Sequence, residues 1–171
     1  MRKREETCCF TGHRPEKLPW GENESDLRCV SLKHRLRAAV ETAYEEGKRH
    51  FICGMARGCD FYFAEIVLEL RRSRPDITLE AAIPCDSQSR GWKLAERMRW
   101  EDLVALCDME TLVQERYTPD CMLRRNRYMV DHSSLVIAVY DGTNGGTRRT
   151  LEYALRQKVP FLDISPVARE E

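Results

Sequence analysis

The sequence has no excess of charge of either sign. Its 171 residues include 28 Lys and Arg residues and 28 Asp and Glu residues, so the formal net charge is zero. Proteins that attract nucleic acid through their overall field carry a basic excess. The balance therefore disfavours nucleic acid as a partner.

Long apolar runs are also missing. No stretch approaches the roughly 18 apolar residues that a membrane-spanning helix needs, and residues 1–6 are charged without the apolar segment of a signal peptide. We therefore expect a cytoplasmic protein that has no contact with a membrane.

Metal-binding patterns and the common cofactor loops are absent as well. None of the eight cysteines forms a C-x-x-C pair, and no histidine falls at zinc-finger spacing. The glycines match neither a G-x-G-x-x-G dinucleotide fingerprint nor a Walker A loop. We expect no metal and no cofactor, and reduced cysteines that pack as small apolar residues.

What the sequence does contain is an alternation of apolar runs with helical patterns. The expected strands are residues 6–11, 50–53, 78–83, 109–114, 135–139 and 160–164, and the expected helices are residues 25–46, a segment after Asp60, and residues 88–107, 120–132 and 147–158. Several strands are continuously apolar, which is typical of parallel strands that are covered on both faces. The sequence therefore predicts the α/β class, as a Rossmann-like three-layer sandwich with a mostly parallel sheet. We expect one domain over residues 1–171, with loose ends at residues 1–5 and 166–171.

Three loops that follow strands carry the candidate binding residues. They are Gly12, His13 and Arg14 after the first strand, Gly54, Arg57, Gly58 and Asp60 after the second, and Asp141, Gly142, Gly145, Gly146 and Thr147 after the fifth. Loops that follow parallel strands lie on one edge of the sheet, where ligands bind. Glycines let a ligand approach the backbone, and a helix start offers unpaired N–H groups, so these loops favour phosphate binding.

The charged residues near these loops have alternative roles. Arg57, set between two glycines, suits recognition of a phosphate or carboxylate. Asp60 is either a ligand group or the cap of the helix that follows. Glu152 is a candidate carboxylate for a sugar hydroxyl or for chemistry, and its alternative is an exposed helix residue.

Four motifs in order resemble a known family. They are C-F-T-G-H-R-P, G-M-A-R-G-C-D, R-R-N-x-Y-M-V-D-x-S and G-G-T-x-x-T-x-E-Y-A, and together they resemble the YpsA-like branch of the SLOG superfamily, which is related to LOG phosphoribohydrolases and DprA. The resemblance implies a nucleotide or nucleotide-derived ligand at the strand edge. It places the ligand-contacting arginine of LOG enzymes on Arg125, beside Asn126. The catalytic glutamate does not transfer cleanly, because Glu152 lies two residues beyond its expected position, a rotation of about 200° on a helix.

Three functions remain open at this point. The first is binding of an ADP-ribose-like molecule or a nucleoside phosphate. The second is hydrolysis of the N-glycosidic bond of a nucleoside monophosphate, with Arg125 and Glu152 as catalytic residues. The third is a DprA-like module for single-stranded nucleic acid or a protein partner. The long amphipathic helices could also supply a homodimer interface.

Overall fold

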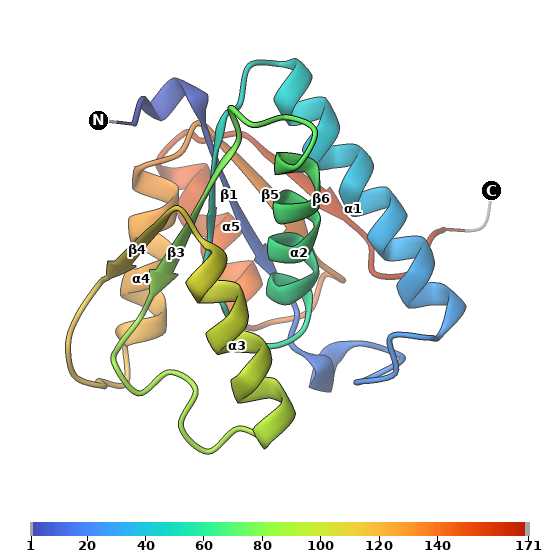
Figure 1. Ribbon diagram of the computed structural model, residues 1–171, viewed down its shortest axis with the longest axis vertical. Helices are drawn as coiled ribbons and strands as arrows, with labels where there is room; N and C mark the ends of the chain where they lie inside the picture. Colours follow the sequence, from blue (N-terminus) through green and yellow to red (C-terminus); the bar gives the residue numbers. More distant parts are fainter. Residues whose placement is uncertain (1, 170–171) are drawn as a thin grey trace.

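The computed structural model describes residues 2–169 as one α/β domain around a six-stranded sheet (Figure 1). The strands are β1 (Thr7–Gly12), β2 (His50–Cys53), β3 (Thr78–Ile83), β4 (Met109–Leu112), β5 (Leu135–Val139) and β6 (Phe161–Ile164). They pair in the order β4-β3-β2-β1-β5-β6, and every pairing is parallel. The Rossmann-like class is confirmed, and the sheet is parallel throughout.

Helices cover both faces of this sheet. They are α1 (Leu27–Glu45), α2 (Cys59–Arg71), α3 (Leu94–Leu106), α4 (Cys121–Asp131) and α5 (Gly146–Arg156). Helices α1 and α2 pack together on one face, with α3 beside α2, and α4 and α5 pack together on the other. Figure 1 shows these three layers, with the strands running between the two groups of helices.

The strands divide their side chains between two apolar clusters. In β1, Cys8 and Phe10 point toward α1 and α2, whereas Cys9 points toward α4 and α5; all three are completely buried. This alternation follows from the two-residue period of a strand. The continuously apolar runs therefore mark strands that are covered on both sides, as the sequence predicted.

The helix that the sequence predicts from residue 88 begins instead at Leu94. Residues 86–91 form turns, and Gly91 has a φ of +82°, which a right-handed helix does not allow. Gln88 is buried in this segment, where it donates to the Gly54 carbonyl at 2.8 Å and accepts from Trp100 Nε1 at 3.0 Å. The sequence pattern placed Gln88 on a helix, whereas its buried side chain in fact stabilises the loop after β2.

Smaller differences concern the ends of elements. The fourth strand stops at Leu112, and the last helix begins one residue earlier than expected, at Gly146. The expected loose ends form hydrogen bonds with the rest of the domain: Thr7 Oγ1 donates to the Lys3 carbonyl at 2.8 Å, and the Arg35 guanidinium donates to the Pro166 carbonyl at 2.9 Å. Residues 1 and 170–171, the outermost parts of those expected ends, lie outside the described residues.

A buried polar network lies at the amino ends of the strands. Glu80 and His50 are only 2% and 3% exposed, with 2.7 Å between Glu80 Oε2 and His50 Nε2. The hydroxyls of Thr111 and Tyr128 each donate to Glu80 Oε1 at 2.6 Å. Burial acts to raise the pKa of Glu80, but these hydrogen bonds outweigh it and lower the pKa.

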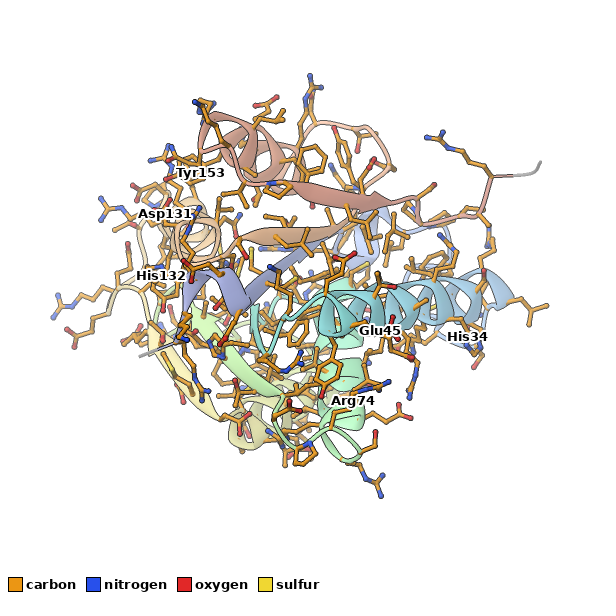
Figure 2. All side chains as sticks on the ribbon, turned by 90° about the horizontal axis from the view of Figure 1, so that it is seen from above. His34, Glu45, Arg74, Asp131, His132 and Tyr153 are labelled. Carbon is orange, nitrogen blue, oxygen red and sulfur yellow. The ribbon has the colours of Figure 1, made fainter. Side chains whose placement is uncertain are left out.

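Figure 2 views the molecule from this end. It shows Asp131 of α4 and Tyr153 of α5 together on one side of the sheet, and Glu45 at the end of α1 on the other. The Tyr153 hydroxyl donates to Asp131 Oδ1 at 2.7 Å and so joins the two helices. Among residues 2–169, no helix is long and apolar enough to cross a membrane.

Candidate functional site

A cavity of about 260 Å³ opens at the carboxyl ends of the strands. It lies where the strand order reverses, because β1 pairs with β2 on one side and with β5 on the other. The loops that leave such a pair diverge, and the crevice between them is the usual ligand site of this fold. The lining residues come from β1 and its loop, the segment before and at the start of α2, one face of α4 and the start of α5: Phe10, Thr11, Gly12, His13, Arg14, Glu16, Lys17, Ala56, Asp60, Met122, Arg125, Asn126, Met129, Gly146 and Thr147.

Arg125 brings a buried positive charge to the cavity wall. The residue is 4% exposed; its Nη1 donates to the Gly54 carbonyl and lies 3.5 Å from the Ala82 carbonyl oxygen, and its Nε donates to Asn126 Oδ1 at 2.9 Å. Among residues 2–169, the hydrogen-bond partner of its Nη2 is the Met122 sulfur, at 3.8 Å. No carboxylate of residues 2–169 forms an ion pair with this guanidinium. Burial lowers the pKa of Arg125, but a guanidinium stays charged, so the cavity wall holds a cation whose Nη2 donates to a sulfur, which is a weak acceptor.

Glycine at position 54 is required for this placement. A Cβ atom on Gly54 would lie 2.6 Å from Arg125 Nη1 and 2.7 Å from Cζ. The second motif therefore contributes to the site through its backbone, which makes room for the arginine of the third motif and accepts a hydrogen bond from it.

Asp60 places a carboxylate beside the same cavity. It is 5% exposed, and its Oδ2 accepts from the backbone N–H of Ala56 at 2.9 Å. The expectation that Asp60 caps α2 is wrong, because Gly58 is the N-cap residue and Asp60 lies in the first turn. Burial raises the pKa of Asp60 to about 6, although Arg125 and the Ala56 N–H act to lower it.

The start of α5 presents open backbone donors. Its N-cap is Gly145, with a φ of +150°, and no side chain of the described residues caps it. The first N–H groups of a helix have no partner within the helix and lie at the positive end of its dipole. Gly146 and Thr147 line the cavity, so these donors and the Thr147 hydroxyl are available to an anion.

His13 ties the loop after β1 to the loop after β5. Its Nε2 lies 2.9 Å from Asp141 Oδ1 and 3.1 Å from the Asp141 backbone nitrogen. Asp141 Oδ1 also accepts from the Thr143 N–H at 2.9 Å and from the Thr143 hydroxyl at 2.6 Å. Burial lowers the pKa of His13, and this outweighs the opposite effect of Asp141. The ring is therefore neutral at pH 7 and joins the two loops by hydrogen bonds rather than as a cation.

Lys17 also spans the two loops, from the other rim of the cavity. Its Nζ donates to the Asn144 carbonyl and lies 3.3 Å from Thr143 Oγ1. A Cβ atom on Gly145 would lie 2.6 Å from this nitrogen, which shows how closely the ammonium group approaches the glycine loop. Sequence reasoning missed Lys17, because the only pattern around it is a loop that contains Pro15.

Two predicted site residues point elsewhere. Arg57 pairs with Glu16 and with Glu96, at 3.1 Å for the latter, and does not line the cavity. Glu152 is exposed and accepts from Arg148 Nε at 3.0 Å, one turn away on the same helix. Neither side chain is in position to contact a ligand in the cavity.

The structure brings the remaining predicted residues together to different degrees. Those that line the cavity are Gly12, His13, Arg14, Asp60, Arg125, Asn126, Gly146 and Thr147. Those that shape its loops from outside the lining are Gly54, Gly58, Asp141, Gly142 and Gly145. Besides Lys17, the sequence reasoning missed the apolar wall of Phe10, Met122 and Met129, where the α4 residues lie seven positions apart and so share one helix face.

The parallel sheet, the reversal of its strand order beside β1 and the cavity at that point define a Rossmann-like α/β domain. The chain belongs to the YpsA family, described as the YspA SLOG family, whose sequence model matches residues 8–160. This confirms the family that the four motifs suggested.

The chain is also similar to individual bacterial proteins. The SPbeta prophage-derived protein YoqJ of Bacillus subtilis (strain 168) is 33% identical, over 73% of this chain and 81% of the relative. A UPF0398 protein of Bacillus thuringiensis (strain Al Hakam) is 25% identical over 94% of both chains.

Among solved structures, the chain is similar in fold to DNA processing protein A. The Helicobacter pylori protein, whose structure describes a single-stranded DNA binding mode, superposes with a TM-score of 0.61 at 13% identity, and the Streptococcus pneumoniae protein with a TM-score of 0.60 at 14%. The matches cover 94% and 93% of this chain, but only 65% and 50% of those two chains. At this level of identity the likeness concerns the fold alone.

Proposed function

We propose that the protein binds a phosphorylated, nucleotide-derived small molecule in the cavity beside β1. The observation that carries the proposal is Arg125, a residue only 4% exposed at the cavity wall that forms no ion pair with a carboxylate of the described residues, although the buried Asp60 attracts it from a longer distance. A buried charge is costly unless it is paired. An anionic ligand supplies the missing partner.

The other lining groups suit different parts of such a ligand. The first turn of α5 and Thr147 suit a phosphate group. Asp60 suits a sugar hydroxyl, because a carboxylate accepts hydrogen bonds from hydroxyl groups. Phe10, Met122 and Met129 give an apolar surface for a base, and Met adapts to planar ligands.

The two other functions have less support. Hydrolysis of an N-glycosidic bond through Glu152 requires that carboxylate at the reacting atoms, whereas Glu152 is exposed and pairs with Arg148. Binding of single-stranded nucleic acid requires a basic groove with aromatic platforms. The zero net charge and the two carboxylates in the lining, Glu16 and Asp60, argue against such a groove.

Thermal unfolding in the presence of nucleotides tests the proposal. The panel contains nucleoside monophosphates, nucleoside diphosphates and ADP-ribose, each at millimolar concentration, with unphosphorylated nucleosides as the negative set. A ligand at about 100 times its Kd stabilises the folded state by about 2.7 kcal/mol, which is readily measured as a rise in Tm. The proposal fails when no phosphorylated compound raises the Tm.

Two adjacent arginines provide a matched pair of variants. Arg125→Met removes the buried charge and should abolish the ligand-induced rise in Tm. Arg124→Met removes an exposed charge that pairs with Asp120 at 2.9 Å, and should leave the rise intact. If Arg125→Met does not fold, Thr147→Val, which removes one hydroxyl from the cavity, should still weaken binding in a folded protein. Equal responses of both arginine variants would contradict the assignment of Arg125.

A further inference from the structure

The peptide between Gly54 and Met55 is the point where the loop after β2 meets Arg125. Its carbonyl oxygen, on Gly54, accepts from Arg125 Nη1 and also from Gln88 Nε2, the latter at 2.8 Å. Met55 is completely buried and has a φ of +57°, in the left-handed region that residues other than glycine rarely adopt. Such a conformation persists only where the surrounding structure holds it. The two donors to the Gly54 carbonyl therefore hold a strained turn in place.

The side-chain amide of Gln88 can hold this carbonyl in only one orientation. Gln88 is 5% exposed, and its amide lies between the Gly54 carbonyl and the indole of Trp100 on α3, whose Nε1 donates to Gln88 Oε1 at 3.0 Å. An indole N–H can only donate and a carbonyl can only accept, so the amide nitrogen faces Gly54. A chain of hydrogen bonds thus runs from α3 through Gln88 and Gly54 to Arg125.

Gln88 does not line the ligand cavity itself. It lines a separate hollow of about 370 Å³, which shares Met122 with the cavity. Any effect of Gln88 on a ligand in the cavity must therefore act through a neighbouring group. The Gly54 carbonyl, which Gln88 and Arg125 share, provides that connection.

Helix α3 holds the loop after β2 at a second point as well. Arg57, in that loop, donates from its Nη1 to Glu96 Oε2 at 3.1 Å. Leu103 is the one buried residue among the 13 residues of α3, so polar contacts contribute much of the attachment of this helix. The position of the loop and the position of α3 therefore depend on each other.

We propose that Gln88 is a positioning residue of the binding site, which fixes the Gly54 carbonyl against Trp100 and thereby sets the place of the Arg125 guanidinium. The inference rests on the proposed function, because this guanidinium is the group that meets the anion. It extends the site to α3, none of whose residues lines the cavity. Because binding linkage is reciprocal, a ligand on Arg125 also changes the surroundings of Trp100.

Gln88→Met tests this role, because it nearly keeps the length and volume of the side chain and removes both hydrogen bonds. Native protein and variant are titrated calorimetrically with adenosine monophosphate, ADP-ribose and inorganic phosphate, well below the Tm of either. The affinity of the variant should fall by about fivefold or more, the ratio that one hydrogen bond provides. Should Gln88→Met not fold, Trp100→Phe, which removes the indole N–H, should still lower the affinity.

Thr111→Val is the matched control for the loss of one hydrogen bond. The Thr111 hydroxyl donates to Glu80 at the amino ends of the strands, far from the cavity, so its loss should lower the Tm of the free protein and leave the affinity unchanged. An affinity that is unchanged in Gln88→Met, or that falls equally in Thr111→Val, overturns the positioning role.

A proton–nitrogen NMR correlation spectrum adds a readout that a merely structural role would not move. The indole N–H signal of Trp100, assigned through Trp100→Phe, should shift when a ligand binds to the native protein and should not shift in Gln88→Met. The indole signal of Trp20, whose partner is Tyr62 Oη at 3.3 Å, should stay in place in both. A Trp100 signal that does not respond in the native protein, or that responds equally in the variant, overturns the inference.

A crystal structure of ligand-free Gln88→Met separates this inference from the proposed function. The Arg125 guanidinium should have moved away from the Gly54 carbonyl, and an unmoved guanidinium overturns the positioning role whatever the ligand is. If the guanidinium has moved but the native protein binds none of the three probes and no other phosphorylated nucleotide, the proposed function is overturned, while the link between Gln88 and Arg125 stands.

Discussion

Replacing Asp60 with asparagine should stabilise the protein, and only above a defined pH. Burial raises the pKa of Asp60 from 3.8 to about 6, because the charged carboxylate is poorly solvated beside the cavity. Asparagine has nearly the same shape and keeps an oxygen that can accept from the Ala56 N–H. The substitution therefore removes the charge while it keeps the local hydrogen bond.

The sign and size of the effect follow from linkage. A carboxyl group whose pKa is higher in the folded state contributes stability that is fully present below pH 3.8 and is lost as the pH rises through about 6. At 1.36 kcal/mol per pKa unit, the shift from 3.8 to about 6 corresponds to about 3 kcal/mol. The free energy of unfolding of Asp60→Asn should exceed that of the native protein by about this amount at pH 8, and by only about 0.5 kcal/mol at pH 4.

Urea unfolding of both proteins at intervals between pH 4 and pH 8 measures this difference directly. The difference should grow between about pH 4 and pH 6 and level off above about pH 7. Other titrating groups are common to the two proteins and cancel. Asp102→Asn, which removes an exposed carboxylate on α3, is the matched control, and its free energy of unfolding at pH 8 should stay close to that of the native protein. A difference between Asp60→Asn and the native protein that does not vary with pH would refute the reasoning.

Three further substitutions test the site and the buried polar network at the opposite end of the sheet. Glu80→Ala leaves the hydroxyls of Thr111 and Tyr128 and the ring of His50 without their acceptor, and should lower the free energy of unfolding by about 3–5 kcal/mol at pH 7 in urea unfolding. Because the pKa of Glu80 is lowered from 4.5, its contribution is present above pH 4.5 and is lost as the pH falls through the folded-state pKa, so the cost should shrink in acid. Gly54→Ala should displace the Arg125 guanidinium and abolish the nucleotide-induced rise in Tm. An unchanged rise would show that the position of Arg125 does not depend on Gly54 or that Arg125 does not bind the ligand. Glu152→Ala should leave that rise unchanged, since Glu152 is exposed and pairs with Arg148 on the same helix. A lost rise would show that Glu152 belongs to the site.

The fold could be predicted because its pattern is local. Continuous apolar runs such as residues 135–139 identify buried parallel strands, and the position of the loops follows from the handedness of the connections. All six predicted strands are present, and the edge on which their loops meet holds the cavity. The start of α3 could not be predicted in the same way, because Gln88 is fixed by Gly54 and Trp100, which are distant in sequence.

The part of the candidate site that the backbone decides was predictable from local pattern, and Arg125 was predictable from the family resemblance. Gly146 and Thr147 line the cavity because a glycine loop at a strand-to-helix junction has few other geometries. The direction of a long charged side chain depends instead on partners that a sequence does not reveal. The sequence predicted Arg57 as a site residue, but its side chain turns toward Glu16 and Glu96. It did not predict Lys17, whose side chain reaches across to Asn144 at the cavity.

A buried charge lies at each end of the sheet, but the two differ in how well the protein itself satisfies them. This difference favours a ligand at the carboxyl end. At the amino end, Glu80 accepts from three side chains, so that buried carboxylate is satisfied within the protein. At the carboxyl end, Arg125 has no carboxylate partner among the described residues, and Asp60 is not close enough to form an ion pair with it. Glu80 therefore needs no further partner, whereas the charge of Arg125 is not neutralised by an ion pair within the described residues. A partner that arrives from solution and carries negative charge would complete the environment of Arg125, which lines the cavity.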